Sequence, residues 1–379
     1  MNTSPLKILG TLGQSLWLDY IRRDLIVSGE LRRMIEDDGL RGMTSNPSIF
    51  EKAIVDSHDY DADIRAMTLE GKGAEEIYEA LSRRDVQSAA DEFRPVYEST
   101  DGRDGYVSLE VNPHLAHDTK GTVDEARRLW AALNRPNVFI KVPATYDGLH
   151  AIQQLVSEGI NVNVTLLFGL PRYRQVAEAY ITGLEERASR GEPVNRIASV
   201  ASFFVSRIDA LVDPLLDKII AQAGRESDLA KKARGQVAIS SAKSAYQIYK
   251  EIFSGERFKR LADKGARTQR LLWASTGTKN PDYSDVKYVE ALIGPDTVNT
   301  IPLETLGAYR DHGDPELRLE TDVREAVGIM ARLPELGIHI GRMTHQLEDE
   351  GVRKFNEPFD KLMGALAHKS QQRMEAGHP

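Results

Sequence analysis

The feature that most constrains the fold of this chain is a repeated alternation of short apolar runs with longer segments of helical spacing. The apolar runs are rich in β-branched residues, which favour β-strands. Eight such runs occur, at residues 15–21, 42–46, 105–112, 137–143, 160–168, 198–205, 270–276 and 297–302. Strands that alternate with helices indicate a parallel sheet covered by helices. Eight of these units can close into a (β/α)₈ barrel of the TIM type, which has no free edge.

The competing architecture is an open, doubly wound sheet, which usually carries a glycine-rich phosphate turn after its first strand. Neither GxGxxG nor GxxxxGK[ST] occurs in the sequence, so the strand count favours the barrel. The 379 residues could form one large domain or two. We expect a single barrel domain over residues 1–379, with helical elaborations around 51–104, 209–265 and 311–379.

The composition excludes several classes of function. The formal net charge is −8, whereas general nucleic-acid binding needs a basic face. With no cysteine, disulfides, thiolate metal sites and cysteine nucleophiles are absent. No apolar run resembles a signal peptide or approaches the ~20 residues of a membrane span. We therefore expect a cytoplasmic protein without nucleic-acid or membrane partners, and either a monomer or a homodimer.

Polar residues interrupt the apolar runs near their ends, where a barrel enzyme carries its chemistry. Nearly every predicted strand supplies at least one of them. A closed barrel would bring these strand ends together over one mouth. The residues are Asp19, Thr44, Asn46, Glu110, Lys141, Asn163, Thr165, Ser202 and Ser275.

Lys141 stands out because it lies inside the apolar run NVFIKVP. Burial there disfavours the charged ammonium form. A neutral amine can attack a carbonyl carbon and form an imine. A structural lysine paired with a carboxylate is an equal alternative on this evidence alone.

Two lone carboxylates in apolar strands, Asp19 and Glu110, could divide acid and base roles beside such a lysine. Either could instead be the counter-ion of the lysine. Four further residues carry hydroxyl or amide groups that could bind sugar hydroxyls: Asn46, Asn163, Thr165 and Ser202. Each could instead cap a helix or form hydrogen bonds with backbone groups at a strand end.

A phosphate site is suggested by Arg207 and by the loop ASTGTKNP at residues 274–281, which includes Lys279. Small residues with free N–H groups can bind an anion, and barrels often bind phosphate after the seventh and eighth strands. The histidines and carboxylates show no metal-ligand spacing. We expect neither a metal nor another cofactor.

Several segments, in order along residues 12–313, resemble transaldolases of the longer bacterial branch. They are GMTSNPSIF, NVFIKVPAT with GLHAI following, INVNVTLLF, SVASFFVSRID and LLWASTGTKNPDYSD with YVEALIGPDTVNTIP. The resemblance implies a (β/α)₈ barrel and a Schiff-base mechanism. Lys141 matches the family's Schiff-base lysine, Asp19 its acid/base aspartate and Glu110 the glutamate that works through a catalytic water.

The resemblance extends to the remaining predicted residues. Thr165 matches the threonine that holds the catalytic water, and Thr44 with Asn46 falls on the TSN motif that contacts the dihydroxyacetone moiety. Asn163 and Ser202 match sugar-contacting positions, and Arg207 and Ser275 match phosphate ligands. Some members carry a second phosphate-binding arginine where this chain has Gly277. We expect Lys279 to supply that charge as a point cation.

The implied reaction moves a dihydroxyacetone unit from sedoheptulose 7-phosphate or fructose 6-phosphate to glyceraldehyde 3-phosphate or erythrose 4-phosphate. Such a transfer belongs to the non-oxidative pentose phosphate pathway. An aldolase that releases the three-carbon unit would use the same residues. A non-catalytic sugar-phosphate sensor would be expected to lose Lys141, Asp19 or Glu110, and all three are present.

Overall fold

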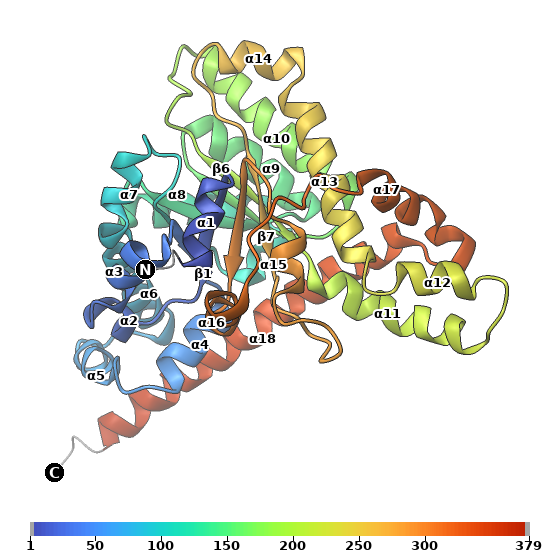
Figure 1. Cartoon of the computed structure of the whole chain (residues 1–379). Coiled ribbons are helices and arrows are strands. Elements are labelled where there is room, and N and C mark those ends of the chain that lie inside the picture. The colour runs from blue at the N-terminus through green and yellow to red at the C-terminus, as the bar shows by residue number, and fades with distance from the viewer. Residues whose placement is uncertain (1–3, 376–379) are drawn as a thin grey trace.

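The centre of the molecule is a closed barrel of eight parallel strands, each paired with its neighbours in sequence, and β8 closes onto β1 (Figure 1). The computed structural model describes residues 4–375. The strands are β1 Gln14–Asp19, β2 Gly42–Thr44, β3 Tyr106–Glu110, β4 Val138–Pro143, β5 Val162–Leu167, β6 Ser199–Phe204, β7 Arg270–Ala274 and β8 Thr297–Ile301. The predicted (β/α)₈ barrel is confirmed.

Each strand is shorter than its predicted run, at one end or at both. The clearest case is the predicted strand 42–46, in which β2 ends at Thr44. The chain then turns, and Asn46 becomes the N-cap of α4. Asn46 and Ser275, which follow the ends of β2 and β7, both lie at the same mouth of the barrel.

Compact crossover helices cover the middle of the barrel. Asp118 caps α8 by accepting a hydrogen bond from the Gly121 N–H at 2.9 Å, and Thr145 caps α9 through the Gly148 N–H at 3.0 Å. Apolar residues on one face of each helix pack against the strands. These helices are α8 Thr119–Leu133, α9 Tyr146–Glu158, α10 Leu170–Ser189 and α15 Lys287–Ala291, with the 3₁₀ helix η2 at Pro113–His117.

Further helices fill the long connections, and α1 precedes the first strand. Those before β3 are α1 Pro5–Thr11, α2 Arg23–Val27, α3 Glu30–Arg33, the π-helical turn η1 Met34–Asp38, α4 Pro47–Val55, α5 Asp61–Leu69, α6 Ala74–Glu92 and α7 Arg94–Ser99. Those between β6 and β7 are α11 Ser206–Ala221, α12 Ser227–Ala233, α13 Val237–Phe253 and α14 Glu256–Ala262. Those after β8 are α16 Leu303–His312, α17 Val323–Arg332, η3 Leu333–Leu336 and α18 Ile340–Glu375.

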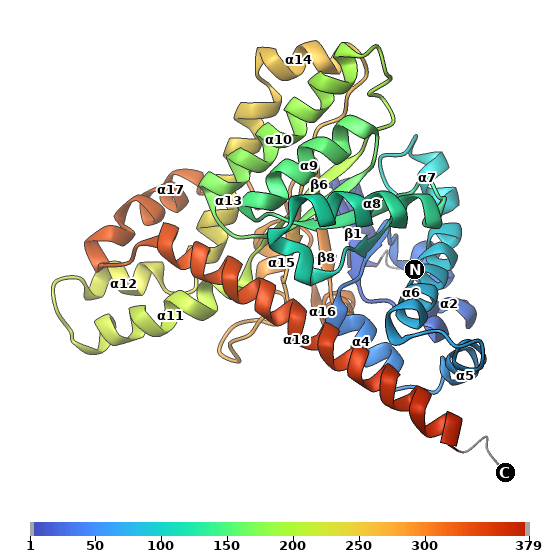
Figure 2. The same cartoon turned by 180° about the vertical axis from the view of Figure 1, so that it is seen from behind.

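The carboxyl-terminal region differs from its predicted form in one respect. Within the predicted elaboration 311–379, the segment PELRLETDVREAVGIMARL at residues 315–333 is expected to be helical, but the helix starts only at Val323. The residues before it do not form a regular helix, because the N–H groups of Arg318 and Leu319 both donate to the carbonyl of Ile293. The final helix, α18, is 36 residues long and runs across the molecule from the region of α11 to α5 (Figures 1 and 2).

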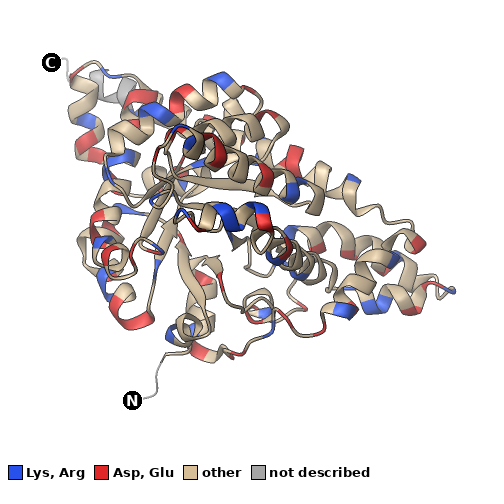
Figure 3. Cartoon of the chain, turned by 90° about the horizontal axis from the view of Figure 1, so that it is seen from above, with Lys and Arg blue, Asp and Glu red and all other residues tan. Residues whose placement is uncertain are grey.

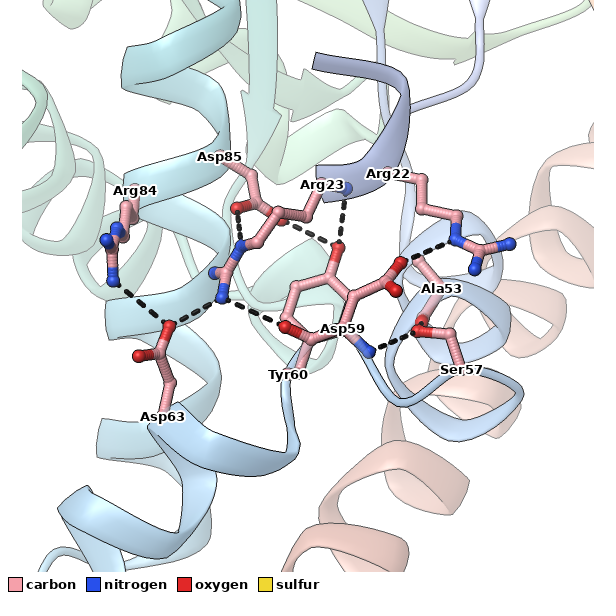
Figure 4. Close-up of polar contacts among 9 residues, drawn as sticks. All are labelled: Arg22, Arg23, Ala53, Ser57, Asp59, Tyr60, Asp63, Arg84 and Asp85. Atoms are coloured by element: carbon pink, nitrogen blue, oxygen red, sulfur yellow. Dashed lines mark hydrogen bonds and ion pairs between the residues drawn. The ribbon is translucent and has the colours of Figure 1, made fainter. Parts of the chain in front are cut away.

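A charged cluster anchors the chain just after β1 (Figure 4). The Arg23 guanidinium donates to Asp85 at 3.0 Å and to Asp63 at 2.5 Å, and it lies 4.4 Å from the ring centroid of Tyr60. The Tyr60 hydroxyl donates to Asp85 at 2.7 Å. Helices α2, α5 and α6 are thereby tied together close to the point where Asp19 ends β1.

The surface carries both signs of charge, with basic and acidic residues interspersed on the helices around the barrel (Figure 3). Among the helices described between residues 4 and 375, none has the length and apolar character needed to cross a bilayer.

Candidate active site

A cavity of about 180 Å³ lies at the carboxyl ends of the strands. A wider cavity of about 870 Å³ adjoins it and shares Asp19, Asn46, Arg207 and Lys279 with it. We call these the inner cavity and the vestibule. The predicted residues that line the inner cavity are Asp19, Thr44, Asn46, Lys141, Thr165, Ser202, Arg207, Ser275 and Lys279. Two predicted residues, Glu110 and Asn163, do not line it.

Lys141 extends from β4 into the inner cavity, and the residue is only 4% exposed. Its Nζ atom donates to the carbonyl oxygen of Ser45 at 3.0 Å and lies 3.5 Å from Glu110 Oε2. The contact with Glu110 is longer than a typical charge-assisted hydrogen bond. The amine is therefore held by one backbone acceptor and remains open to an incoming carbonyl carbon.

Glu110 lies beside Lys141, because the two residues are partners in the register of β3 and β4. Both carboxylate oxygens are buried and have no hydrogen-bond partner within the described residues. Burial raises the pKa of Glu110 to about 7, and the charge of Asp19 adds to the rise, while Lys141 opposes it. A carboxyl that titrates near neutrality suits a proton shuttle.

A Glu110→Gln variant is expected to show how this buried carboxyl affects stability. The folded pKa is about 7 against an ordinary 4.5, so the folded protein binds the proton more tightly. The stability due to the proton is present below about pH 4.5 and is lost as the pH rises through about 7. The wild-type protein loses this stability as the pH rises, and the variant does not. The free energy of unfolding of the variant minus that of the wild type should therefore increase by roughly 1–3 kcal/mol from pH 4.5 to pH 7. Urea unfolding at both pH values measures it, and a pH-independent difference would contradict the assignment.

Asp19 forms a second acidic centre at the end of β1. Burial raises its pKa, against the lowering influence of Lys141 and of the hydrogen bond from Thr44. The Thr44 hydroxyl donates to Asp19 Oδ1 at 2.7 Å and lies 2.7 Å from the Thr300 hydroxyl. Since Thr44 has one hydroxyl proton, Thr300 must donate to Thr44. This chain of hydroxyls fixes the direction of the Asp19 carboxylate.

Thr165 lines the inner cavity, and its buried hydroxyl has no hydrogen-bond partner among the described residues. The next residue, Leu166, has a φ of 55°, and the pairing of β5 with β6 shifts register between Val164 and Leu167. Such an irregularity redirects side chains at the end of a strand. The Thr165 hydroxyl is left available for a ligand or a water molecule.

Asn163 is held inside the barrel, where both polar atoms of its side chain have a partner. Its Nδ2 donates to the Ser108 hydroxyl at 3.0 Å, and its Oδ1 accepts from the Ser202 hydroxyl at 2.6 Å. Ser202 itself lines the inner cavity. The structure thus places Asn163 behind Ser202, where it orients the serine.

Asn46 combines the two roles that the sequence left open. Its Oδ1 accepts a hydrogen bond from the Ile49 N–H at 3.0 Å and so caps α4. The same side chain lines both the inner cavity and the vestibule. The cap uses the amide oxygen, so the amide nitrogen is the donor that remains for a ligand.

Two cations lie on the outer side of the inner cavity. Desolvation lowers the pKa of Arg207, near the start of α11, and desolvation together with Arg207 lowers the pKa of Lys279. Among the described residues, neither side chain forms an ion pair within 4 Å. Nearby, the Ser275 hydroxyl lies 3.1 Å from that of Ser206. Two unpaired cations beside hydroxyl donors are the features of an anion site.

Gly277 lies at this anion site, at the position where the sequence departs from the motif that it resembles by lacking an arginine. A Cβ atom there would lie 3.2 Å from Thr305 Oγ1 and 3.4 Å from Pro302 Cγ, so a larger side chain would require these neighbours to move. Lys279 lines the inner cavity and the vestibule. Within the described residues, no group of three or more His, Asp or Glu side chains is placed to hold a metal ion.

Six lining residues were not among the predicted site residues: Phe204, Ala274, Gly277, Thr300, Pro302 and Phe355. Thr300 lies in β8 and could have been found by extending the search for polar strand-end residues to the eighth strand, whereas Phe204, at the end of β6, is apolar and escapes that search. Phe355 comes from α18, which is far from every strand in the sequence. It resembles any core residue of an amphipathic helix, so no local sequence signal could have found it.

Comparisons with known proteins agree with one another. Residues 16–366 match the family described as Transaldolase/Fructose-6-phosphate aldolase. A protein of Trichodesmium erythraeum named Transaldolase is 50% identical over 373 residues, covering 97% of this chain and 98% of that protein. Transaldolase 2 of Nostoc punctiforme is 48% identical over 375 residues, covering 97% and 98%. Transaldolase of Thiobacillus denitrificans is 48% identical over 360 residues, covering 95% and 99%.

Proposed function

This chain belongs to the transaldolase/fructose-6-phosphate aldolase family, and from that premise we propose that it transfers a dihydroxyacetone unit between phosphosugars as a transaldolase. The donors are sedoheptulose 7-phosphate or fructose 6-phosphate, and the acceptors are glyceraldehyde 3-phosphate or erythrose 4-phosphate. One observation carries the proposal: a buried lysine, Lys141, shares a cavity with the unpaired cations Arg207 and Lys279. The geometry suits a carbonyl at one end of a substrate and a phosphate at the other.

The first step joins the ketose to Lys141. The neutral amine attacks C2 of the sugar, and the resulting carbinolamine loses water to give an iminium ion. Glu110 supplies the proton for the departing hydroxyl, through a water molecule held by Thr165. The pKa of Glu110, about 7, suits this exchange. The unpartnered hydroxyl of Thr165 supports its role.

The second step breaks the C3–C4 bond. Asp19 accepts the proton of the C4 hydroxyl, and the electrons of the breaking bond move to the iminium nitrogen. An aldose phosphate leaves, and a three-carbon enamine remains on Lys141. The hydrogen bond from Thr44 supports the orientation of Asp19 as the base.

The third step is the reverse addition to an acceptor aldehyde. Asn46 and Ser202 bind the hydroxyls of the enamine, and Asn163 holds Ser202 in place. Thr44 acts indirectly, because its hydroxyl orients the Asp19 carboxylate. Arg207, Ser275 and Lys279 bind the phosphate of the donor or of the acceptor. Keeping the enamine away from solvent favours its transfer to the acceptor.

A coupled assay of fructose 6-phosphate with erythrose 4-phosphate tests the function. We expect sedoheptulose 7-phosphate and glyceraldehyde 3-phosphate in equal amounts. The family also contains aldolases, which would release dihydroxyacetone with or without an acceptor. Formation of free dihydroxyacetone as the main product in the presence of the acceptor would overturn the proposal.

Replacing Arg207 by alanine is expected to raise KM for fructose 6-phosphate by about 10- to 100-fold, because charge-assisted hydrogen bonds to the phosphate are lost. Steady-state kinetics measure the change, and Arg207→Lys should recover part of the loss. Arg174, which pairs with Glu251 on the outer helices, supplies a matched control. An unchanged KM in Arg207→Ala would contradict the phosphate role.

The proposal extends to the cellular setting. A transaldolase serves the non-oxidative pentose phosphate pathway, and we assign this chain to the cytoplasm on that basis. Its other partners are the phosphosugars themselves, and it acts as a monomer or a homodimer.

A further inference from the structure

The last helix supplies one wall of the inner cavity. Phe355 of α18 lines the cavity, and the residue is 5% exposed. Its ring centroid lies 5.5 Å from Lys141 Nζ. The ring is therefore close to the atom on which the covalent intermediates form, and it comes from an element outside the barrel (Figure 2).

The position of Phe355 is fixed by close packing of α18 on the barrel. One turn before it, Gly351 lets the helix approach Leu166, since a Cβ at residue 351 would lie 2.9 Å from Leu166 Cδ2. Leu166 directly follows Thr165 and carries the unusual φ of 55°. The helix thus contacts the same strand irregularity that directs Thr165 into the cavity.

Ion pairs hold α18 on both sides of this contact. Glu348 pairs with Arg172 of α10 at 3.2 Å, and Lys361 pairs with Glu51 of α4 at 2.5 Å. The two pairs lie before and after Phe355 in the helix. The ring is consequently held as a fixed wall in this structure.

We propose that Phe355 is a specificity-determining residue that keeps water from the three-carbon enamine on Lys141 and so favours transfer over release. This inference rests on the proposed transaldolase function. It assigns the last helix a part in the outcome of the reaction, beyond the binding and acid–base groups of the strand ends.

The reaction that the wall suppresses consumes one water. The enamine carbon C3 takes a proton and forms an iminium ion, water adds to C2 with loss of a proton, and the C2–N bond then breaks. The products are free dihydroxyacetone and the neutral amine of Lys141, with no net change in protons. An apolar ring beside the nitrogen limits the access of this water.

The ring has a second effect on the same intermediates. The face of an aromatic ring attracts a cation within about 6 Å of its centroid. An iminium nitrogen near the present position of Lys141 Nζ would lie in this range. The ring can therefore stabilise the iminium ion while it excludes solvent, whereas an aliphatic side chain would only exclude solvent.

The experiment compares Phe355 with a matched control on the same helix. Phe359 lies one turn further along and is equally buried at 5%, but it packs on Tyr78 and His114 and does not line the inner cavity. The variants are Phe355→Ala, Phe355→Leu and Phe359→Ala. Each is given fructose 6-phosphate without an acceptor, with the aldehyde product removed enzymatically, and free dihydroxyacetone is measured.

We expect Phe355→Ala to increase dihydroxyacetone release per donor cleaved on the order of tenfold, and Phe355→Leu to increase it less. Phe359→Ala should leave the ratio unchanged, although it should lower the thermal stability. If Phe355→Ala fails to fold, the result for Phe355→Leu decides. An unchanged ratio in the folded Phe355 variants, or an equal rise in Phe359→Ala, would overturn the inference.

Borohydride trapping separates this inference from the proposed function. With fructose 6-phosphate, every folded variant should retain a covalent label on Lys141. Labelling of Lys141 with an unchanged release ratio would overturn the role of Phe355 alone. Absence of the label in the wild-type protein would instead overturn the proposed function.

Discussion

Replacing Lys141 by methionine is expected to reduce the transaldolase rate by about 10⁴- to 10⁶-fold, because a covalent pathway cannot proceed without its nucleophile. Methionine preserves most of the volume of the buried side chain, so the barrel should remain folded. The coupled assay measures the rate. Borohydride trapping followed by peptide mass analysis should show the label on Lys141 in the wild-type protein and nowhere in the variant.

The chain offers a matched control for this substitution. Lys243 in α13 is 7% exposed, nearly as buried as Lys141, and its ammonium group donates to the carbonyl oxygen of Thr321 at 2.7 Å. It lines neither the inner cavity nor the vestibule. Lys243→Met should cost stability and leave the rate per folded molecule nearly unchanged. A Lys141→Met variant that kept more than about one per cent of the rate would rule out the Schiff base.

Replacing Asp19 by asparagine is expected to slow the overall reaction by about 10²- to 10⁴-fold while the Schiff base still forms. The amide keeps the size of the carboxylate and can still accept the hydrogen bond from Thr44. It cannot take the proton of the C4 hydroxyl. Trapping of Lys141 with fructose 6-phosphate should therefore persist, while release of glyceraldehyde 3-phosphate should be almost lost.

Asp104 provides the comparison for Asp19. It is buried, and it pairs with Arg270 at 2.9 Å at the amino-terminal end of the strands, away from the inner cavity. Asp104→Asn should lower the stability of the fold and preserve carbon–carbon bond cleavage. If Asp19→Asn lost both trapping and cleavage, Asp19 would act before the bond-breaking step and the assignment would need revision.

The barrel itself could be predicted because its signal repeats. Each strand is a short apolar run, and each is followed by helical spacing, so eight weak local signals reinforce one another. The search for polar residues near the ends of strands then indicated the correct end of the barrel. It identified Lys141 and Asp19, which line the inner cavity, and Glu110, which lies beside the lysine.

Other parts of the site depend on contacts that no local pattern reveals. Whether Asn163 faces the cavity or the barrel interior is decided by the hydroxyls of Ser108 and Ser202, which lie on other strands. The wall formed by Phe355 depends on how a distant helix packs on Leu166. The start of α17 was placed too early because the carbonyl of Ile293 competes for N–H groups that helical periodicity assigns to a turn.

The origin of that wall has a consequence for biosynthesis. The strand-end groups from Asp19 to Thr300 are all translated before the final helix, whose Phe355 follows the end of β8 at Ile301 by a long stretch of chain. At 5–20 residues per second, a ribosome needs on the order of seconds to cover that distance. A nascent barrel could therefore hold its nucleophile and acid–base groups while the site is still open to water. Completion of the last helix is the event that closes it, so the newly made enzyme would gain selectivity after it gains reactivity.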